Sequence, residues 1–213
     1  MAIEQTAIPK EELELFKQLK DLKVIFDVGA RTDTDYLGLW PESQHHLFEP
    51  NPEFAKELRE KVKDKPNVFV NEFGLGDKKT EEGYQTGLQS FIDSLAINNP
   101  NVTKDLILSI KTLDDYIRER ELGRIDFLKI DTEGYELKIL LGAMNWYHVI
   151  KYIQYEHWGK SNNLMIRGLL SEHFDAFDVG YRNVFCINRN LVDSTERQRL
   201  ATCIMDNKLE ELQ

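Results

Sequence analysis

Short apolar runs, each closed by a turn residue and followed by a charged or helix-forming segment, recur along this chain up to residue 156. The first run, residues 24–28 (VIFDV), ends at Gly29, and the second, residues 45–48 (HHLF), ends before Pro50. Further runs occupy residues 68–71, 106–110, 125–130 and 152–156. Strands that alternate with helices in this way predict an α/β fold, a doubly wound, mostly parallel sheet with helices on both faces.

Three segments outside these runs complete the predicted architecture. Residues 10–21 carry apolar residues at helical spacing, so we expect a helix packed on the core within an N-terminal region of residues 1–23. Residues 177–181 and 183–187 predict a C-terminal antiparallel strand pair in a domain of residues 24–192. Residues 193–213 predict an amphipathic helix that packs on the same domain or forms a homodimer contact.

The chain is acidic, and its negative charge limits the kinds of partner that it can bind. Among its 213 residues, 27 Lys and Arg stand against 37 Asp and Glu, a net charge of −10 with neutral histidines. Such a charge argues against nucleic acid or an anionic membrane as partner. The longest weakly polar stretch, residues 139–150, is far shorter than the ~20 residues of a membrane span. Two cysteines only, Cys186 and Cys203, and an N-terminus without secretory features indicate a reducing, cytoplasmic setting.

Two acidic residues mark the ends of the first two predicted strands. Asp27 precedes Gly29, and Glu49 follows the second run, 22 residues beyond Asp27. An acidic residue at this spacing can accept hydrogen bonds from the two hydroxyls of a ribose. The loop GARTDT after the first strand lacks the glycine pattern that cradles a pyrophosphate. The pattern therefore indicates a nucleoside ligand without phosphates, although a plain turn and a solvated glutamate would give the same residues.

A larger set of motifs resembles one family of enzymes. In chain order the motifs are DVGA at 27–30, LFEPNP at 47–52, FGLGD at 73–77, SIKTLDDYI at 109–117, IDFLKIDTEGYELKILLGA at 125–143 and YEHW at 155–158. Their order and spacing over residues 24–188 are similar to those of the FkbM family of S-adenosylmethionine-dependent methyltransferases. The resemblance implies a Rossmann-like class I methyltransferase fold, S-adenosylmethionine as donor, and methyl transfer to an oxygen of a small molecule or glycan.

The resemblance also implies roles for individual residues. The implied donor-binding residues are Asp27, Gly29, Arg31, Glu49, Phe73, Gly74, Leu75 and Asp131. Within this set, Glu49 would hold the ribose, and residues 73–75 would contact the adenine. A sulfonium cation is favoured by carboxylates in a partly dehydrated cleft, which suits Asp131 and Glu133 after the run at 125–130.

One motif departs from the family pattern, which usually reads DVGANxG. This chain has Arg31 in place of the asparagine and Asp33 in place of the glycine. In the interpretation that we favour, the donor still binds, and Arg31 pairs with its methionine carboxylate or holds Asp33 in place. The alternative is a catalytically silent relative that binds a nucleoside or a protein partner. An NAD- or nucleotide-sugar-binding Rossmann enzyme is disfavoured by the missing glycine pattern.

Methylation of an alcohol requires a base within hydrogen-bond reach of the hydroxyl. We expect His157 to be this base, with Asp131 as the alternative and Glu133 beside it, because these residues follow predicted strands. A packed or surface histidine, and acids that merely favour the first turn of a helix, are the competing interpretations. Asp131, Glu156 and His157 could also hold Mg²⁺ or Mn²⁺, although nothing in their spacing demands a metal ion.

The acceptor pocket is the least defined part of the sequence. Ser90 lies in a glycine- and asparagine-bearing segment, residues 83–101, that predicts a loop or hairpin over one face of the sheet. Ser90 and Trp158 are the candidates for substrate contact. Further aromatic candidates are Trp40, Tyr84, Phe91 and Tyr155. Aromatic residues belong more often to a core than to a pocket, so these four carry little weight.

Overall fold

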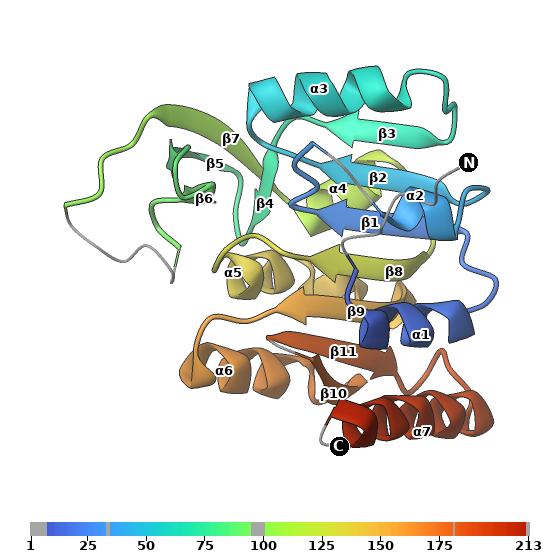
Figure 1. Cartoon of the computed structure of the whole chain (residues 1–213). Helices are drawn as coiled ribbons and strands as arrows, with labels where there is room; N and C mark the ends of the chain where they lie inside the picture. Colours follow the sequence, from blue (N-terminus) through green and yellow to red (C-terminus); the bar gives the residue numbers. More distant parts are fainter. Residues whose placement is uncertain (1–7, 33–34, 95–100, 181, 212–213) are drawn as a thin grey trace.

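The computed structural model describes residues 8–32, 35–94, 101–180 and 182–211. Its centre is a seven-stranded sheet with the strand order β10-β11-β9-β8-β1-β2-β3 (Figure 1). In chain order the strands are β1 (Val24–Val28), β2 (Gln44–Phe48), β3 (Val68–Asn71), β8 (Ile125–Ile130), β9 (Ile150–Glu156), β10 (Phe174–Gly180) and β11 (Asn183–Asn188). Neighbouring strands from β3 to β9 pair in parallel, whereas β11 is antiparallel to β9 and to β10. The predicted mostly parallel sheet with an antiparallel C-terminal pair is confirmed.

The strand order reverses at β1, which lies between β2 and β8. All residues of β1 are buried. Phe26 and Val28 belong to one apolar cluster and Ile25 to another, because successive side chains of a strand point to opposite faces. The carboxyl ends of β1, β2 and β8 therefore lie next to one another, at the edge where a doubly wound sheet binds ligands.

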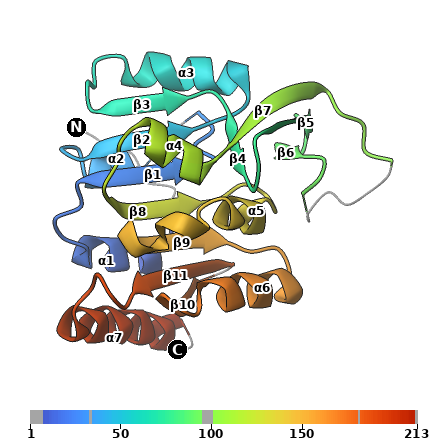
Figure 2. The same cartoon turned by 180° about the vertical axis from the view of Figure 1, so that it is seen from behind.

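Helices cover both faces of the sheet (Figures 1 and 2). On the face of Ile25, apolar residues come from α1 (Lys10–Gln18), α2 (Tyr36–Leu39) and α7 (Ser194–Glu211). On the face of Phe26 they come from α4 (Leu113–Glu119), α5 (Glu136–Leu141), the 3₁₀ helix η1 (Met144–Val149) and α6 (Lys160–Leu170). The predicted crossover helix is α3 (Pro52–Val62), whose Leu58 packs against Leu47 of β2.

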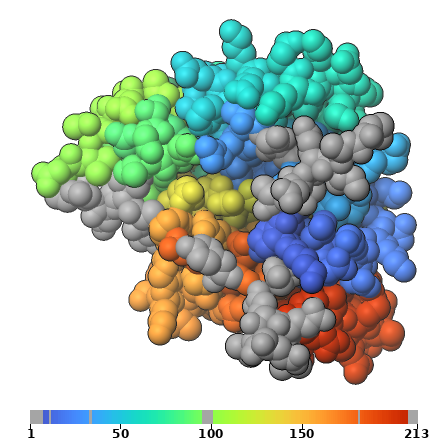
Figure 3. Space-filling view, viewed as in Figure 1, coloured from blue at the N-terminus to red at the C-terminus, as the bar shows by residue number. Residues whose placement is uncertain are grey.

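A second, four-stranded sheet has the order β4-β7-β5-β6 and projects from the side of the molecule (Figure 3). Its strands are β4 (Gly74–Gly76), β5 (Thr80–Gln85), β6 (Ser90–Phe91) and β7 (Leu106–Thr112). The run at 106–110 forms a strand as predicted. The prediction that this strand belongs to the main sheet was wrong. Strand β7 instead pairs in parallel with β4 and antiparallel with β5.

The first and last helices lie side by side on one face of the molecule (Figure 3). Leu15 and Phe16 of α1 and Leu200 and Ile204 of α7 are buried in the same cluster. These side chains of α7 pack within their own chain, and a homodimer contact of this helix stays a prediction. Among the described residues, no helix combines the length and the apolar character that crossing a bilayer requires.

Candidate active site

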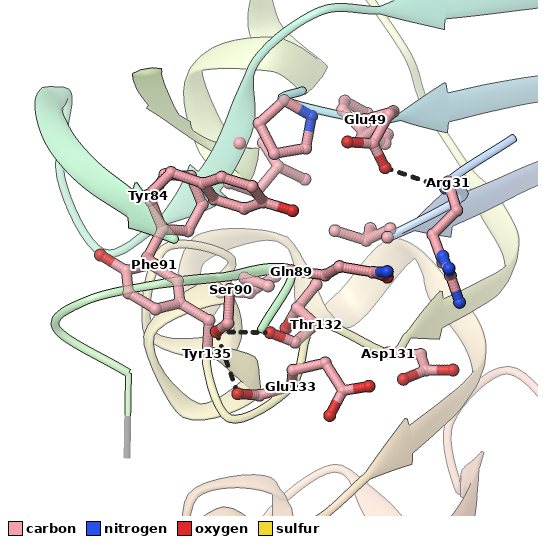
Figure 4. Close-up of a pocket in the computed structure, with 17 residues that line it drawn as sticks. Arg31, Glu49, Tyr84, Gln89, Ser90, Phe91, Asp131, Thr132, Glu133 and Tyr135 are labelled. Carbon is pink, nitrogen blue, oxygen red and sulfur yellow. Dashed lines mark hydrogen bonds between the residues drawn. The ribbon is translucent and has the colours of Figure 1, made fainter. Parts of the chain in front are cut away.

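A cavity, which we call the main cavity, opens where β1, β2 and β8 end (Figure 4). Gly29, Arg31 and Glu49, which follow β1 and β2, line one side of it. The turn after β8 and strands of the small sheet line the other sides. The main cavity holds about 690 Å³ of empty space, counting its open mouth.

The loop after β1 passes close to the turn after β8 because position 29 is a glycine. Gly29 has a φ of +88°, and a Cβ atom there would lie 1.9 Å from the backbone oxygen of Asp131. The N–H of Asp131 donates to the backbone oxygen of Val28 at 3.0 Å. Only a glycine permits this approach, so the DVGA motif fixes the two strand ends that border the main cavity.

Glu49 is held at the wall of the main cavity by two backbone N–H groups. Its Oε2 accepts from Arg31 at 2.9 Å (Figure 4), and its Oε1 accepts from Asn51 at 2.8 Å. The residue is only 3% exposed, and this burial raises the pKa of Glu49 to about 6. Each carboxylate oxygen keeps a further lone pair for a donor of a ligand.

Asp131 and Glu133 lie across the main cavity from Glu49 (Figure 4). The hydroxyl of Ser90 donates to the backbone oxygen of Glu133 at 3.1 Å, which ties the small sheet to the turn after β8. The buried carboxylate of Glu136 accepts from two backbone N–H groups of the same turn, each at 3.0 Å. Three contacts of this kind give the turn a fixed shape and give its carboxylates a fixed position.

The remaining wall of the main cavity is apolar and aromatic. Its residues are Phe48, Leu75, Tyr84, Phe91 and Tyr135. Gly74 also lines it, and a Cβ atom there would lie 2.6 Å from the ring of Phe91. Phe73, which we expected to contact adenine, does not line the cavity, since its ring packs on Phe48 with the centroids 5.8 Å apart.

Three carboxylates meet at the carboxyl ends of β8 and β9. One oxygen each of Asp131, Glu133 and Glu156 lies within 4.8 Å of the others. Burial, followed by the charges of Asp131 and Glu133, raises the pKa of Glu156 to about 7. Burial and the charge of Asp131 also raise the pKa of Glu133. A carboxyl group with a pKa raised in this way can exchange protons near neutral pH, and three neighbouring carboxylates can bind a cation.

A second cavity, which we call the polar chamber, lies on the other face of β1 and β8, beside α1. Asp27 and Lys129 line it from paired positions on the two strands. The Nζ atom of Lys129 lies 3.4 Å from Asp27 Oδ1 and 3.3 Å from Asp131 Oδ2. The expectation that Asp27 and Glu49 border one crevice is not met. Side chains alternate along β1, so Val28 faces the main cavity and Asp27 faces the polar chamber.

His157 lines neither cavity, which argues against our expectation that it is the base. It is half-buried, and this burial lowers the pKa of its imidazole. Of the metal set that we considered, Asp131 and Glu156 come together, but within the described part of the chain Glu133 takes the place of His157 beside them. Neighbouring residues at the end of a strand point in different directions, and here Glu156 faces the carboxylates.

Other sequence candidates also lie away from the two cavities. Trp158 is covered by the guanidinium of Arg182, whose central carbon lies 4.1 Å from the ring centroid. Trp40 and Tyr155 pack in the apolar clusters on the two faces of the sheet. Asp33 lies outside the described residues. Of the aromatic candidates, Tyr84 and Phe91 alone line the main cavity as the structure describes it.

Sequence reasoning missed Gln89 and Tyr135 in the main cavity and Lys129 in the polar chamber. A signal for Lys129 was present, because a cation inside an apolar strand requires a counter-charge. Alignment of residues 125–130 with residues 24–28 in parallel register would have paired Lys129 with Asp27. Gln89 and Tyr135 carried no such signal, since their positions depend on how the small sheet meets the large one.

Comparison with solved structures defines the class of protein to which this fold corresponds. An rRNA methylase from Streptococcus thermophilus matches with a TM-score of 0.51 at 12% identity, covering 88% of this chain and 99% of that one. Aeropyrum pernix fibrillarin, solved with bound S-adenosyl-L-methionine, matches with a TM-score of 0.50 at 13% identity, covering 84% of this chain and 74% of that one. The fold is that of the class I methyltransferases.

Sequence comparison narrows the class to a family. The profile of the Methyltransferase FkbM domain matches residues 27–173, and this chain belongs to that family. Hexuronic acid methyltransferase AglP from Haloferax volcanii is 24% identical over 162 residues, covering 74% of this chain and 65% of AglP. The 2-O-methyltransferase NoeI from Sinorhizobium fredii is 24% identical over 172 residues, covering 70% of this chain and 71% of NoeI. The match with AglP thus spans about two thirds of the length of that relative.

Proposed function

We propose that this chain is an S-adenosylmethionine-dependent O-methyltransferase that acts on a hydroxyl group of a small molecule or glycan. The observation that carries the proposal is the position of Glu49, which faces Asp131 and Glu133 across the main cavity. Membership of the FkbM family supports it, and the names of the two relatives describe methyltransferases for hexuronic acid and for a 2-O position. The net charge of −10 favours such acceptors over nucleic acid.

The residues of the main cavity fit this donor. The carboxylate of Glu49 is an acceptor, and the two ribose hydroxyls are donors. Leu75 and Phe91 offer an apolar surface to the adenine ring. When bound, S-adenosylmethionine supplies a methyl group on a positively charged sulfur. Asp131 and Glu133 would stabilise that charge from the opposite side of the main cavity.

Asp131 is the proton acceptor in this proposal, in place of His157. Its side chain is 45% exposed and it lines both cavities, so an acceptor hydroxyl can approach it. As the hydroxyl oxygen bonds to the methyl carbon, its proton passes to Asp131, and the electrons of the breaking carbon–sulfur bond remain on sulfur. Lys129, 3.3 Å from Asp131, holds the carboxylate in place.

The carboxylate cluster offers a second way to activate the hydroxyl. Asp131, Glu133 and Glu156 provide the oxygen ligands that Mg²⁺ and Mn²⁺ prefer. A divalent ion there would lower the pKa of the acceptor hydroxyl. Turnover measured after chelator treatment, with and without added Mg²⁺, separates this route from direct proton transfer to Asp131.

Titration calorimetry with S-adenosylhomocysteine tests donor binding. We expect the wild-type chain to bind it. Glu49→Gln should weaken binding about 10- to 100-fold, because a hydrogen bond to a charged group contributes about 1.5–3 kcal/mol. The matched control Glu53→Gln changes an exposed glutamate of α3 and should leave the affinity unchanged. A wild-type chain that does not bind contradicts the proposal, and binding without turnover on a library of hydroxyl compounds favours the silent relative.

We also propose that the chain works in the cytoplasm, under reducing conditions. Both cysteines are free thiols, Cys186 buried and Cys203 half-buried. Free thiols of this kind are typical of reducing compartments. Fractionation of the source cells, with detection of the chain by antibody, tests the assignment.

A further inference from the structure

The polar chamber is built from buried polar side chains on adjacent elements. Asp27 of β1, Lys129 of β8 and Gln154 of β9 occupy neighbouring positions across the sheet. Gln154 Nε2 and Asn183 Nδ2 donate to the two carboxylate oxygens of Glu12 on α1, at 2.7 and 2.6 Å. Asp27 is 2% exposed, and Gln154 and Glu12 are each 3% exposed. This row is therefore an interior polar surface, and interior polar groups need hydrogen-bond partners.

One acceptor atom of this row lacks any such partner. Oε1 of Gln154 is buried and accepts no hydrogen bond from the residues that the structure describes. Oδ1 of Asp27 also accepts none, although the ammonium of Lys129 lies 3.4 Å away. A buried acceptor without a hydrogen bond destabilises the fold. The side-chain amides of the row already donate to Glu12, and Lys129 lies between two carboxylates. A ligand that brings its own donors would satisfy both oxygens.

The polar chamber also carries excess negative charge. Its ionisable carboxyl groups and its ammonium group are those of Glu12, Asp27, Asp35, Asp131 and Lys129. Burial raises the pKa of Glu12. Even without Glu12, the carboxylates of Asp27 and Asp131 outnumber the one ammonium group of the described lining. An incoming carboxylate would be repelled, whereas hydroxyl groups would find acceptors.

Asp131 connects the polar chamber to the main cavity, because it lines both. A hydroxyl held in the polar chamber can therefore approach the carboxylate that faces the main cavity. Methyl transfer requires the acceptor oxygen and the methyl carbon to be held in line and close together. The polar chamber adjoins the main cavity at Asp131, so it can hold an acceptor beside a donor in the main cavity.

We propose that the polar chamber is the acceptor subsite and that it binds an uncharged, polyhydroxylated ring, such as a neutral sugar residue, through Gln154, Asp27 and Asp131. This inference rests on the proposed function, whose substrate class it specifies. The ring hydroxyls donate to Oε1 of Gln154 and Oδ1 of Asp27, and one hydroxyl lies at Asp131. A uronic acid, the substrate class in the name of AglP, would bring a carboxylate into an acidic chamber. This chain is therefore expected to prefer a neutral sugar over a uronic acid.

Saturation-transfer NMR on the full chain tests the proposal with defined probes. The probes are methyl α-glucopyranoside, methyl α-galactopyranoside and methyl α-mannopyranoside, together with the methyl glycosides of glucuronic and galacturonic acid, with and without S-adenosylhomocysteine. We expect at least one neutral glycoside to bind, and the uronic acid glycosides to give signals weaker by about fivefold or more, which corresponds to about 1 kcal/mol. Gln154→Leu should reduce the neutral signal by a similar factor. The matched control Gln44→Leu, at the opposite end of the parallel strands, should not change it.

A crystal of the wild-type chain soaked with the bound glycoside gives a second measurement that does not depend on the folding of Gln154→Leu. Sugar density in the polar chamber is expected. The proposal is overturned if no neutral glycoside binds, if the uronic acid glycosides bind equally well, if Gln154→Leu and Gln44→Leu behave alike, or if the sugar lies elsewhere. Calorimetry with S-adenosylhomocysteine reports the proposed function separately, because that ligand probes the main cavity.

Discussion

Replacement of Glu49 by glutamine tests how the burial of one carboxylate affects both stability and binding. Burial raises the pKa of Glu49 from its ordinary 4.5 to about 6. A carboxyl group with a higher pKa in the folded state binds protons more tightly there, so its ionisation destabilises the fold as the pH rises from about 4.5 through about 6. The difference between the two pKa values corresponds to about 2 kcal/mol of unfolding free energy once both states are ionised.

Glu49→Gln removes this titration and keeps the size of the side chain. The single amide oxygen can accept from only one of the N–H groups of Arg31 and Asn51, which costs about 1 kcal/mol at every pH. We therefore expect the unfolding free energy of the variant, relative to the wild type, to shift by about 1.5 kcal/mol in favour of the variant between pH 4.5 and pH 7.5.

Urea unfolding at the two pH values measures this shift. Other groups titrate over the same range, but they are common to both proteins and cancel in the difference. Glu53→Gln is the control, because it makes the same chemical change at an exposed position of α3. If the difference for Glu49→Gln is constant, the raised pKa of Glu49 and the destabilisation derived from it are refuted.

Three further outcomes follow from the site. Gly29→Ala should lose at least about 2 kcal/mol of unfolding free energy in urea, because φ is +88° and a backbone oxygen lies 1.9 Å from the new Cβ. Gly38→Ala, with open space around it, should change stability by less than about 1 kcal/mol, and equal losses would contradict the close approach. Ser90→Ala and Ser43→Ala each remove a hydrogen bond from a buried hydroxyl, so each should lower the unfolding free energy in thermal unfolding by about 1 kcal/mol. Of the two variants, only Ser90→Ala should weaken the binding of S-adenosylhomocysteine. Calorimetry from pH 6 to pH 8 should show S-adenosylmethionine binding tighten relative to S-adenosylhomocysteine, which lacks the sulfonium charge, as Glu156 ionises around its pKa of about 7. A Glu156→Gln variant with an unchanged pH dependence would count against this.

The main sheet could be predicted from the sequence because its strands are short, apolar and closed by turn residues. Residues 24–28, 125–130 and 150–156 lie in the interior of the sheet, covered on both faces, and such strands read as continuous apolar runs. Strand β7 has the same local pattern, yet it pairs with β4 and β5 in the small sheet. Pairing depends on contacts between distant segments, which the local pattern does not contain.

The same distinction applies to the site. Gly29 and Glu49 could be found because spacing along the chain fixes where they fall relative to the strand ends. His157, the expected base, lines neither cavity. It directly follows Glu156, and the sequence does not say which of the two faces the carboxylates. Lys129 was overlooked because its role depends on the register between β8 and β1. Residues whose roles arise from register or from packing between sheets were the ones that sequence reasoning misplaced.

The shared position of Asp131 between two compartments has a thermodynamic consequence. A molecule in either compartment that displaces this side chain, or fixes its ionisation state, changes the environment presented to the other compartment. Such an effect is reciprocal, so the factor by which the first occupant alters the affinity of the second equals the factor in the reverse direction. The order in which two ligands bind and the inhibition by products would then both depend on Asp131. A substitution of Asp131 would change the affinities of the main cavity and of the polar chamber together.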